Sequence, residues 1–318
     1  MNGTTHRRLT RVARDIVRWV IALAILLVLG QRLSRDWSSV RAAIDTLRWA
    51  WIVLAALPAI LYFCTRVQAW RSILARLSVI APWWSAASVF MNSEVIRYIP
   101  GTFWAFLGRV VQGKKFAPNR MTIAASLALE MLLLACISLG LSALFLIGYP
   151  RYQFAARLLI LVLVMLACLL PLVPTLTRRV VVVFARVLRR QSAVVFSGSL
   201  AAPYGWIALA WTLYTLFHIA VAVALHWPTS PSSLTALAGI TLISWFLGFV
   251  SFLTPSGLGV REGVVVLLAA PYLATTDAIV YAAVSRVLLT LIELIVLAAI
   301  NGVAKVRSSR IPVSVVTE

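Results

Sequence analysis

The chain has 318 residues, of which 62% are hydrophobic and 12% are charged, a composition outside the range of soluble proteins and typical of a membrane protein. Its 29 basic and 9 acidic residues give a formal net charge of +20. Because the basic residues fall in short segments between apolar runs, this charge indicates membrane topology and contact with anionic lipid headgroups rather than nucleic acid binding. No polar stretch is long enough for a separate soluble domain, so we expect one integral, all-α domain over residues 1–318.

Eight apolar runs predict a polytopic bundle of about eight transmembrane helices. A full crossing needs ~20 apolar residues, and the first and seventh runs are shorter than that. The first run follows an arginine-rich segment and is not followed by a small-residue cleavage site, so an uncleaved first helix is expected. The eight runs are residues 16–30, 49–65, 121–147, 157–173, 203–226, 234–253, 260–274 and 277–303.

Eight crossings place the terminal segments, residues 1–15 and 304–318, on the same side of the membrane. Of the basic residues, 22 fall in segments assigned to the inside and 6 in segments assigned to the outside, which favours cytoplasmic termini. We therefore expect a multi-pass protein of a prokaryotic plasma membrane. The three cysteines lie in or at the ends of apolar runs without metal-site spacing, so neither disulfides nor a metal is expected.

Two segments have amphipathic helical patterns, residues 33–47 and residues 178–196. Each places charged side chains on one face, which is typical of a helix that lies at the membrane surface. We expect the first at the outer surface and the second at the inner surface. A solvated charged face explains both patterns better than a specific binding site does.

A third segment, residues 82–110, is expected to enter the membrane and return without crossing. It is interrupted at Pro100-Gly101, a pair that breaks a helix, and strongly basic sequence flanks it on both sides, so both ends are assigned to the inside. Glu94 and Arg97 precede the break at a spacing that lets them pair on one helix face, and Arg109 follows it.

A second break lies late in the chain, where Pro255 removes a backbone donor and two glycines permit unusual backbone angles. We expect a half-helix to begin near Val260. Its free N–H groups, its dipole and Arg261 would together form an anion site suited to a lipid phosphate. Glu262 would either orient Arg261 or take up a coupling proton. The alternative is an ordinary loop with Arg261 at the cytoplasmic surface. The glycines are Gly257 and Gly259.

The surroundings of the two breaks are similar, which suggests an inverted repeat. Arg109 after the first break is followed by Glu130 in the next apolar run, and Glu262 after the second is followed by Arg286. Intramembrane charges are functional candidates by default, and Glu293 on the face of Arg286 is another. The alternative is structural ion pairing, for example of Glu130 with Arg286. His218 is expected to be a satisfied core histidine.

The stretch from Pro255 to Glu262 resembles the late motif of a flippase-like membrane family that includes the transmembrane region of lysylphosphatidylglycerol synthase. The first break, Arg109, Glu130 and Arg286 are also similar to the family pattern. The resemblance implies a polytopic bundle that moves lipids or lipid-linked sugars between leaflets. After residue 303 only a short tail follows, so the soluble synthase domain and its aminoacylation activity are not expected.

The leading hypothesis is thus a flippase for an anionic phospholipid or a polyprenyl-phosphate-linked lipid, with no cofactor. Pro255-Ser-Gly and Ser285-Arg286 superficially resemble lipid phosphatase motifs, but Leu258 and Ile292 stand where that chemistry needs histidines. No catalytic or ATP-binding signature is present, so we do not expect an enzyme. The alternatives are a membrane-embedded glycosyl- or phospho-transferase, or an accessory subunit that contacts cell-envelope biosynthesis enzymes.

Overall fold

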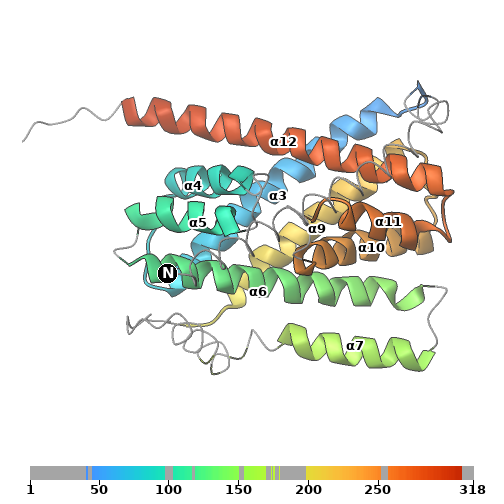
Figure 1. Ribbon diagram of the computed structural model, residues 1–318, viewed down its shortest axis with the longest axis horizontal. Helices are drawn as coiled ribbons and strands as arrows, with labels where there is room; N and C mark the ends of the chain where they lie inside the picture. Colours follow the sequence, from blue (N-terminus) through green and yellow to red (C-terminus); the bar gives the residue numbers. More distant parts are fainter. Residues whose placement is uncertain are drawn as a thin grey trace, which may run out of the picture.

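A computed structural model describes residues 45–96, 103–116, 119–149, 154–169, 198–251 and 257–309, with single positions at 41, 173, 175 and 179. Within these residues every regular element is a helix (Figure 1). Two short 3₁₀ turns, η1 and η2, extend α5 and α6. The elements are α3 (Trp49–Arg76), α4 (Trp83–Ile96), α5 (Phe103–Gln112), η1 (Gly113–Lys115), α6 (Arg120–Phe145), η2 (Leu146–Gly148), α7 (Phe154–Leu169), α9 (Ala201–Ala224), α10 (Pro231–Val250), α11 (Val260–Ala269) and α12 (Thr275–Ser309).

Five of the helices are long and apolar enough to cross a membrane, namely α3, α6 with η2, α9, α10 and α12. They confirm five of the eight predicted spans. The remaining described runs form α7, with 16 residues, and α11, with 10 residues. At 1.5 Å per residue α11 is about 15 Å long, half of a ~30 Å membrane core. The predicted run 260–274 is therefore a half-helix and not a span, and run 16–30 lies outside the described residues.

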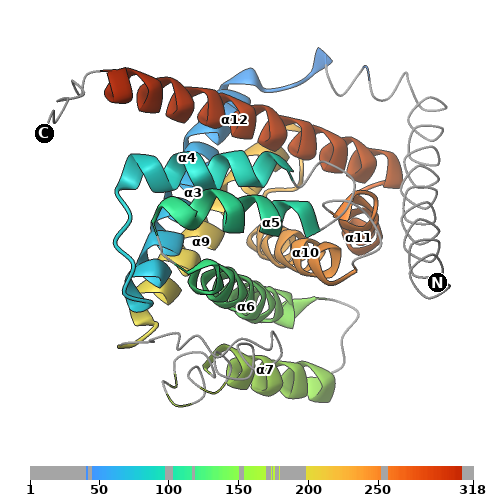
Figure 2. The ribbon, with the colours of Figure 1, turned by 60° about the vertical axis from the view of Figure 1, so that its left-hand side comes forward.

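The centre of the bundle is formed by α3 and α9, which pack against each other along much of their length. At this contact the rings of Tyr62 of α3 and Tyr214 of α9 lie 5.4 Å apart. The two helices also carry large, fully buried side chains, among them Trp70, Trp211 and Phe217. In Figures 1 and 2, α12 lies across one side of this pair and α6 across the other. The polar side chains discussed below are held between these layers.

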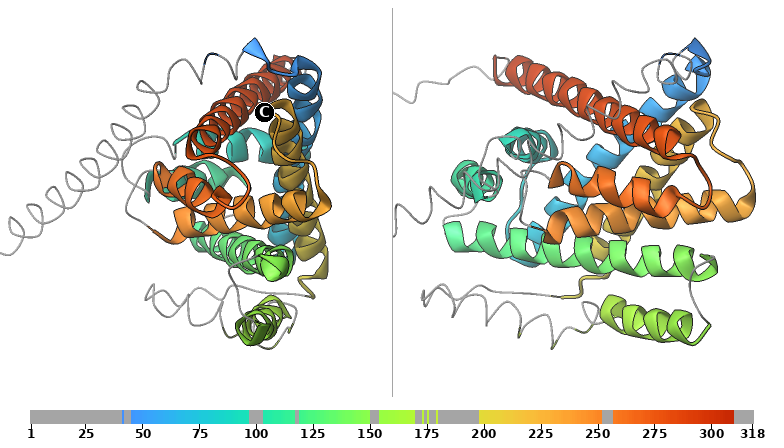
Figure 3. Two further views of the ribbon diagram at one scale, coloured as in Figure 1. Left: turned by 90° about the vertical axis from the view of Figure 1, so that its right-hand side faces the viewer. Right: turned by 45° about the vertical axis from the view of Figure 1, so that its right-hand side comes forward.

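Residues 82–110 form two short packed helices, α4 and α5, which lie side by side (Figure 3). With 14 and 10 residues, neither is long enough to be a span, which agrees with the expected hairpin. The residues between them, 97–102, which include Arg97, Pro100 and Gly101, lie outside the described residues. The predicted surface helix 33–47 is described only at its end, where Arg41 and Asp45 form an exposed pair at 4.0 Å. Segment 178–196 lies almost wholly outside the described residues.

The two breaks belong to two similar units that run in opposite directions. In each unit a helix of 10 residues, α5 or α11, is followed by a short connection and a long helix, α6 or α12. Figure 1 shows α6 starting at the left end of the molecule and α12 starting at the right end. The two half-helices therefore end at opposite ends of the bundle, an arrangement typical of inverted repeats in transporters.

Candidate functional site

Four buried charges from α3, α4, α5 and α6 form a closed ring of ion pairs, which includes both helices of the first unit. Each of the two carboxylates accepts hydrogen bonds from both guanidinium groups, and each guanidinium binds both carboxylates. All four residues are at most 6% exposed. The contacts are Arg66 Nη1 to Glu94 Oε2 at 3.2 Å, Arg66 Nη2 to Glu130 Oε1 at 2.8 Å, Arg109 Nη2 to Glu94 Oε1 at 2.6 Å and Arg109 Nη1 to Glu130 Oε2 at 2.5 Å. We call this set the ion-pair ring.

The surroundings of the ion-pair ring add one further hydrogen bond and an aromatic contact. Arg109 Nε donates to Ser93 Oγ at 2.8 Å, and the Phe90 ring lies under both guanidinium groups, at 5.0 Å from Arg66 and 4.2 Å from Arg109. Glu130 lies ten residues after Arg120, the start of α6, a depth of about 15 Å at 1.5 Å per residue. The ring thus combines two positive and two negative charges near mid-membrane depth with no net charge.

In the second unit, the half-helix α11 begins at Val260, as the sequence predicted. Gly257 and Gly259 have φ of 69° and 83°, a region that favours glycine. Glu262 Oε2 accepts a hydrogen bond from the Gly259 N–H at 2.7 Å. One of the N–H groups expected to be available at the N-terminus is therefore capped by Glu262.

The side chain of Arg261 lies over the backbone of α10 at Gly248. A Cβ on Gly248 would lie 2.5 Å from Arg261 Cγ and 2.8 Å from Arg261 Nε. A Cβ on Gly257 would lie 2.9 Å from the Gly248 carbonyl oxygen and 3.0 Å from Arg261 Nε. The guanidinium lies over the Trp245 ring, 5.5 Å from its centroid. Because Gly248 and Gly257 have no side chain, a narrow channel for the Arg261 side chain remains between α11 and α10, and the backbone of Gly257 lies against that of Gly248.

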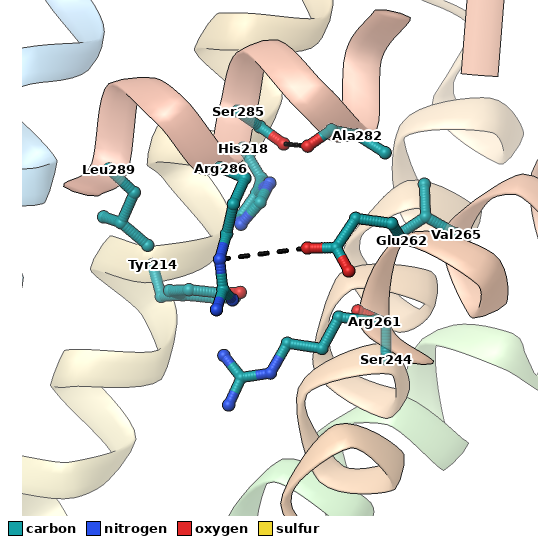
Figure 4. Close-up of a pocket in the computed structure, with 10 residues that line it drawn as sticks. All are labelled: Tyr214, His218, Ser244, Arg261, Glu262, Val265, Ala282, Ser285, Arg286 and Leu289. Carbon is teal, nitrogen blue, oxygen red and sulfur yellow. Dashed lines mark hydrogen bonds and ion pairs between the residues drawn. The ribbon is translucent and has the colours of Figure 1, made fainter. Parts of the chain in front are cut away.

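A small pocket of about 30 Å³ lies between α9, α10, α11 and α12. Figure 4 shows side chains from these helices around the Glu262 carboxylate. Arg286 Nε lies 3.8 Å from Glu262 Oε1. The lining thus holds two guanidinium groups and one carboxylate, with one positive charge in excess. The lining residues are Tyr214, His218, Ser244, Arg261, Glu262, Val265, Ala282, Ser285, Arg286 and Leu289; we call this space the headgroup pocket.

His218 contributes a polar atom to the headgroup pocket that the sequence did not predict. Its Nδ1 lies 2.8 Å from Tyr281 Oη, while its Nε2 is buried and has no hydrogen-bond partner among the described residues. The side chain is 7% exposed. The expectation of a satisfied core histidine therefore holds for one ring nitrogen and is wrong for the other.

One family model covers the residues of both clusters. The model of the family described as the lysylphosphatidylglycerol synthase transmembrane region matches residues 16–297. The chain belongs to this family. The match includes α3 to α11 and most of α12, so it confirms the resemblance seen in the late motif. A comparison with curated proteins found no match.

In this family member, the described site residues fall into two groups rather than one. Arg109 and Glu130 belong to the ion-pair ring, and Arg261, Glu262 and Arg286 line the headgroup pocket. The pairing of Glu130 with Arg286 that the structural alternative suggested is not observed, because each contacts a different partner. Pro255 lies outside the described residues. Among described residues, no group of three His, Cys, Asp or Glu side chains is placed to hold a metal ion.

Glu293 is fully buried on α12, two turns after Arg286, and it does not line the headgroup pocket. The same helix face continues to Asn301, which is joined to Asn92 of α4 by two amide hydrogen bonds of 3.1 Å. Ser88 Oγ also donates to Asn301 Oδ1 at 3.0 Å. Polar residues along α12 therefore extend from the headgroup pocket, at Arg286, to the contact with α4, at Asn301.

Proposed function

We propose that this protein moves an anionic phospholipid or a polyprenyl-phosphate-linked lipid between the two leaflets of a membrane, with the lipid phosphate bound in the headgroup pocket. The observation that carries the proposal is the excess of positive charge among the residues lining this pocket, two guanidinium groups against one carboxylate. A guanidinium grips phosphate through two parallel hydrogen bonds. The location we propose is a prokaryotic plasma membrane, with cytoplasmic termini.

The depth of the headgroup pocket supports transport. Arg286 lies eleven residues after Thr275, the start of α12, a depth of about 16 Å. A phosphate held there is near the middle of a ~30 Å core, where a charged group costs at least ~2.5 kcal/mol without partners. Positive groups at this depth lower the cost of moving a headgroup across. Acyl chains remain in the surrounding lipid.

The opposite directions of the two units support alternating access. Transporters with inverted repeats move one repeat against the other around a site near the membrane midplane. Here the ion-pair ring holds α3, α4, α5 and α6 together, while the Glu262–Arg286 ion pair that joins α11 to α12 is longer, at 3.8 Å. We propose that the first unit is the rigid part and that α11 moves with the headgroup.

A second candidate function, phosphoryl transfer from a lipid phosphate, has one observation in its favour. His218 Nε2 is a buried nitrogen beside Arg261 and Arg286, which are surroundings that a histidine nucleophile requires. Such chemistry also needs an acid/base group in the pocket. Glu262 is already engaged by Gly259 and Arg286, so we favour transport and propose that the chain is not an enzyme.

The direct test is a flipping assay in proteoliposomes, with a fluorescent phosphatidylglycerol whose outer-leaflet fraction is quenched by dithionite. We expect Arg286→Gln to slow flipping by about tenfold or more, the equivalent of ~1.5–3 kcal/mol for one charged hydrogen bond. The matched control is Arg120→Gln, an exposed arginine at the start of α6, which should flip at the parent rate. Formation of phosphatidate or diacylglycerol from the labelled phosphatidylglycerol in the same vesicles would instead indicate the second function.

A binding experiment locates the phosphate. Labelled phosphatidylglycerol is titrated against the protein in detergent over a range of salt. We expect Arg261→Lys to weaken binding less than Arg261→Ala, because lysine keeps the charge and loses the planar fork. Gly259→Val should remove binding, since φ of 83° is strained for a β-branched residue. Parent-like binding by both Gly259→Val and Arg261→Ala would show that the phosphate does not bind at α11.

A further inference from the structure

The headgroup pocket is small in the conformation that the structure shows. Its volume is about 30 Å³, and one buried water needs ~10–15 Å³, so there is room for one or two particles of about that size. A lipid phosphate, with four oxygens and its ester groups, needs more room. Binding of the lipid phosphate therefore requires α11 to move first, and before that movement the pocket suits only a smaller ligand.

The charge of the headgroup pocket indicates which small ligand fits. Its described lining has two guanidinium groups and one carboxylate, an excess of one positive charge. The side chains of Arg286 and Glu262 are only 18% and 12% exposed. Hydrogen bonds that the guanidinium groups make to neutral groups leave this charge unchanged. An uncompensated charge at membrane depth is costly, whereas one monovalent anion makes the lining and its ligand neutral together.

His218 adds a hydrogen-bond donor to the same space. Its Nδ1 lies 2.8 Å from Tyr281 Oη, and the Tyr281 hydroxyl lies 3.5 Å from the His218 carbonyl oxygen. The tyrosine has one hydrogen to donate, and the shorter contact is the stronger hydrogen bond, so we assign this hydrogen to the contact with Nδ1. The hydrogen of the imidazole is then on Nε2, which is buried and has no hydrogen-bond partner among the described residues.

A buried donor without a partner is rare in native proteins, and this one belongs to a residue that lines the headgroup pocket. Figure 4 shows the His218 ring on the α9 side of the pocket, with Arg261 and Glu262 of α11 on the other side. Tyr214, one helical turn before His218, also lines the pocket and has a hydroxyl that can donate. Water would satisfy the Nε2–H but leave the excess charge uncompensated. A small anion satisfies both.

We propose that the headgroup pocket binds one small inorganic anion, such as chloride, between His218 Nε2 and the guanidinium groups of Arg261 and Arg286, and that a lipid phosphate displaces this anion when α11 moves. A phosphodiester also carries one negative charge, so the exchange keeps the filled pocket neutral. The anion site itself does not rest on the proposed function, whereas the displacement step does.

Binding of radioactive chloride to the purified protein in detergent tests the anion site without lipid and without flipping. Gluconate, which is too large for the pocket, keeps the ionic strength constant. We expect one saturable site, for which bromide competes and sulfate does not, because sulfate has four oxygens. Competition by sulfate as strong as that by bromide would overturn the proposal, as would the absence of saturable binding.

Two substitutions at His218 separate the donor from the shape of the ring. His218→Gln keeps an N–H group near the position of Nε2, whereas His218→Phe keeps a ring without a donor. We expect His218→Phe to bind chloride about tenfold more weakly or worse, as for one lost hydrogen bond to a charged group, and His218→Gln to keep part of the affinity. The matched control is His226→Gln, at an exposed histidine just after α9, which should bind like the parent. Equal affinities of His218→Phe and the parent would show that Nε2 does not hold the anion.

The charge of the lining provides an arm that leaves His218 unaltered. Glu262→Gln raises the excess from one positive charge to two, so it should bind chloride more tightly than the parent, and unchanged or weaker binding would contradict the charge argument. Phosphatidylglycerol added to the chloride-loaded parent should release the label. Retention of the label at saturating lipid would overturn the displacement step. Chloride binding as expected, in a protein that flips no lipid, would contradict the proposed function and leave the anion site in place.

Discussion

An ion pair between Glu262 and Arg286 joins α11 to the long helix α12, with 3.8 Å between Glu262 Oε1 and Arg286 Nε. The other oxygen of the same carboxylate caps α11 through the Gly259 N–H at 2.7 Å. The Glu262 side chain therefore has three roles. It caps the start of α11, it neutralises one of the two guanidinium charges in the headgroup pocket, and it joins α11 to α12. Changes at Glu262 should affect these three roles differently.

Replacing Glu262 with glutamine should separate the charge from the cap. The amide oxygen of Glu262→Gln still accepts from Gly259, while the lining of the headgroup pocket gains a full positive charge. We expect tighter binding of anionic lipid and slower flipping, because the headgroup is released less readily. Glu262→Ala should also lose the cap, at about 0.5–2 kcal/mol, measured as a lower melting temperature. Weaker lipid binding by Glu262→Gln than by the parent would contradict this assignment.

The channel around Arg261 can be tested with two alanine substitutions of glycine. Gly248→Ala places a Cβ 2.5 Å from Arg261 Cγ, so the arginine must move out of the headgroup pocket. We expect its lipid affinity to fall towards that of Arg261→Ala, with the fold retained because the displaced atoms belong to a flexible side chain.

Gly263→Ala is the matched control for Gly248→Ala. It lies on α11 itself, with no atom within 4 Å of the added Cβ. It should bind lipid like the parent and gain up to ~1 kcal/mol of helix stability, as alanine does over glycine. Equal affinities for Gly248→Ala and Gly263→Ala would show that Arg261 does not bind lipid from this channel.

The sequence predicted the second unit better than the first because its determinants are local. The short stretch from Pro255 to Glu262 contains the two positive-φ glycines, the start of the half-helix at Val260 and the charged residues Arg261 and Glu262. The ion-pair ring was missed in part. The predicted apolar run ends at residue 65, so the sequence places Arg66 in the cytoplasmic segment that follows. In the structure α3 continues to Arg76. Its contact with Glu130, 64 residues away, depends on packing between helices, which periodicity does not encode.

One sequence signal was sufficient to suggest that Arg66 is buried. Trp70 lies one helical turn after it, and hydrophobic side chains continue to Leu74, so an apolar helix face extends past the arginine. His218 gave no such signal, because the partner of its Nδ1, Tyr281, belongs to another helix and meets it only in the folded bundle.

The ends of the bundle give a direct test of orientation. Ser230 and Lys114 are both exposed and lie in the connections before α10 and before α6. We expect Ser230→Cys to be labelled in intact cells by a membrane-impermeant thiol reagent, and Lys114→Cys to be labelled only after lysis. The background requires replacement of Cys64, Cys136 and Cys168. The reverse labelling pattern would invert the topology derived from the basic residues.

The last prediction concerns the ion-pair ring, where removing one charge leaves the others buried and unbalanced. Breaking a buried pair from one side costs about 3–5 kcal/mol. Glu130 is 1% exposed and contacts both Arg66 and Arg109, so Glu130→Gln should lower the melting temperature and the yield of extractable protein. Arg286→Gln should do neither, because Arg286 is partly exposed to the headgroup pocket.

A double charge swap then distinguishes this ring from a direct link between the two clusters. Because Glu130 and Arg286 have different partners, the swap Glu130→Arg with Arg286→Glu should be as unstable as Glu130→Arg alone. The swap within the ring, Glu130→Arg with Arg109→Glu, restores the neutral net charge of the ring, although each new side chain also faces a like charge, at Arg66 or at Glu94. It should recover part of the stability lost in Glu130→Arg. Thermal unfolding of each variant in the same detergent, together with its flipping rate, provides the comparison. Full recovery by the Glu130–Arg286 swap, and none by the Glu130–Arg109 swap, would mean that the two clusters exchange partners during transport and that the first unit is not rigid.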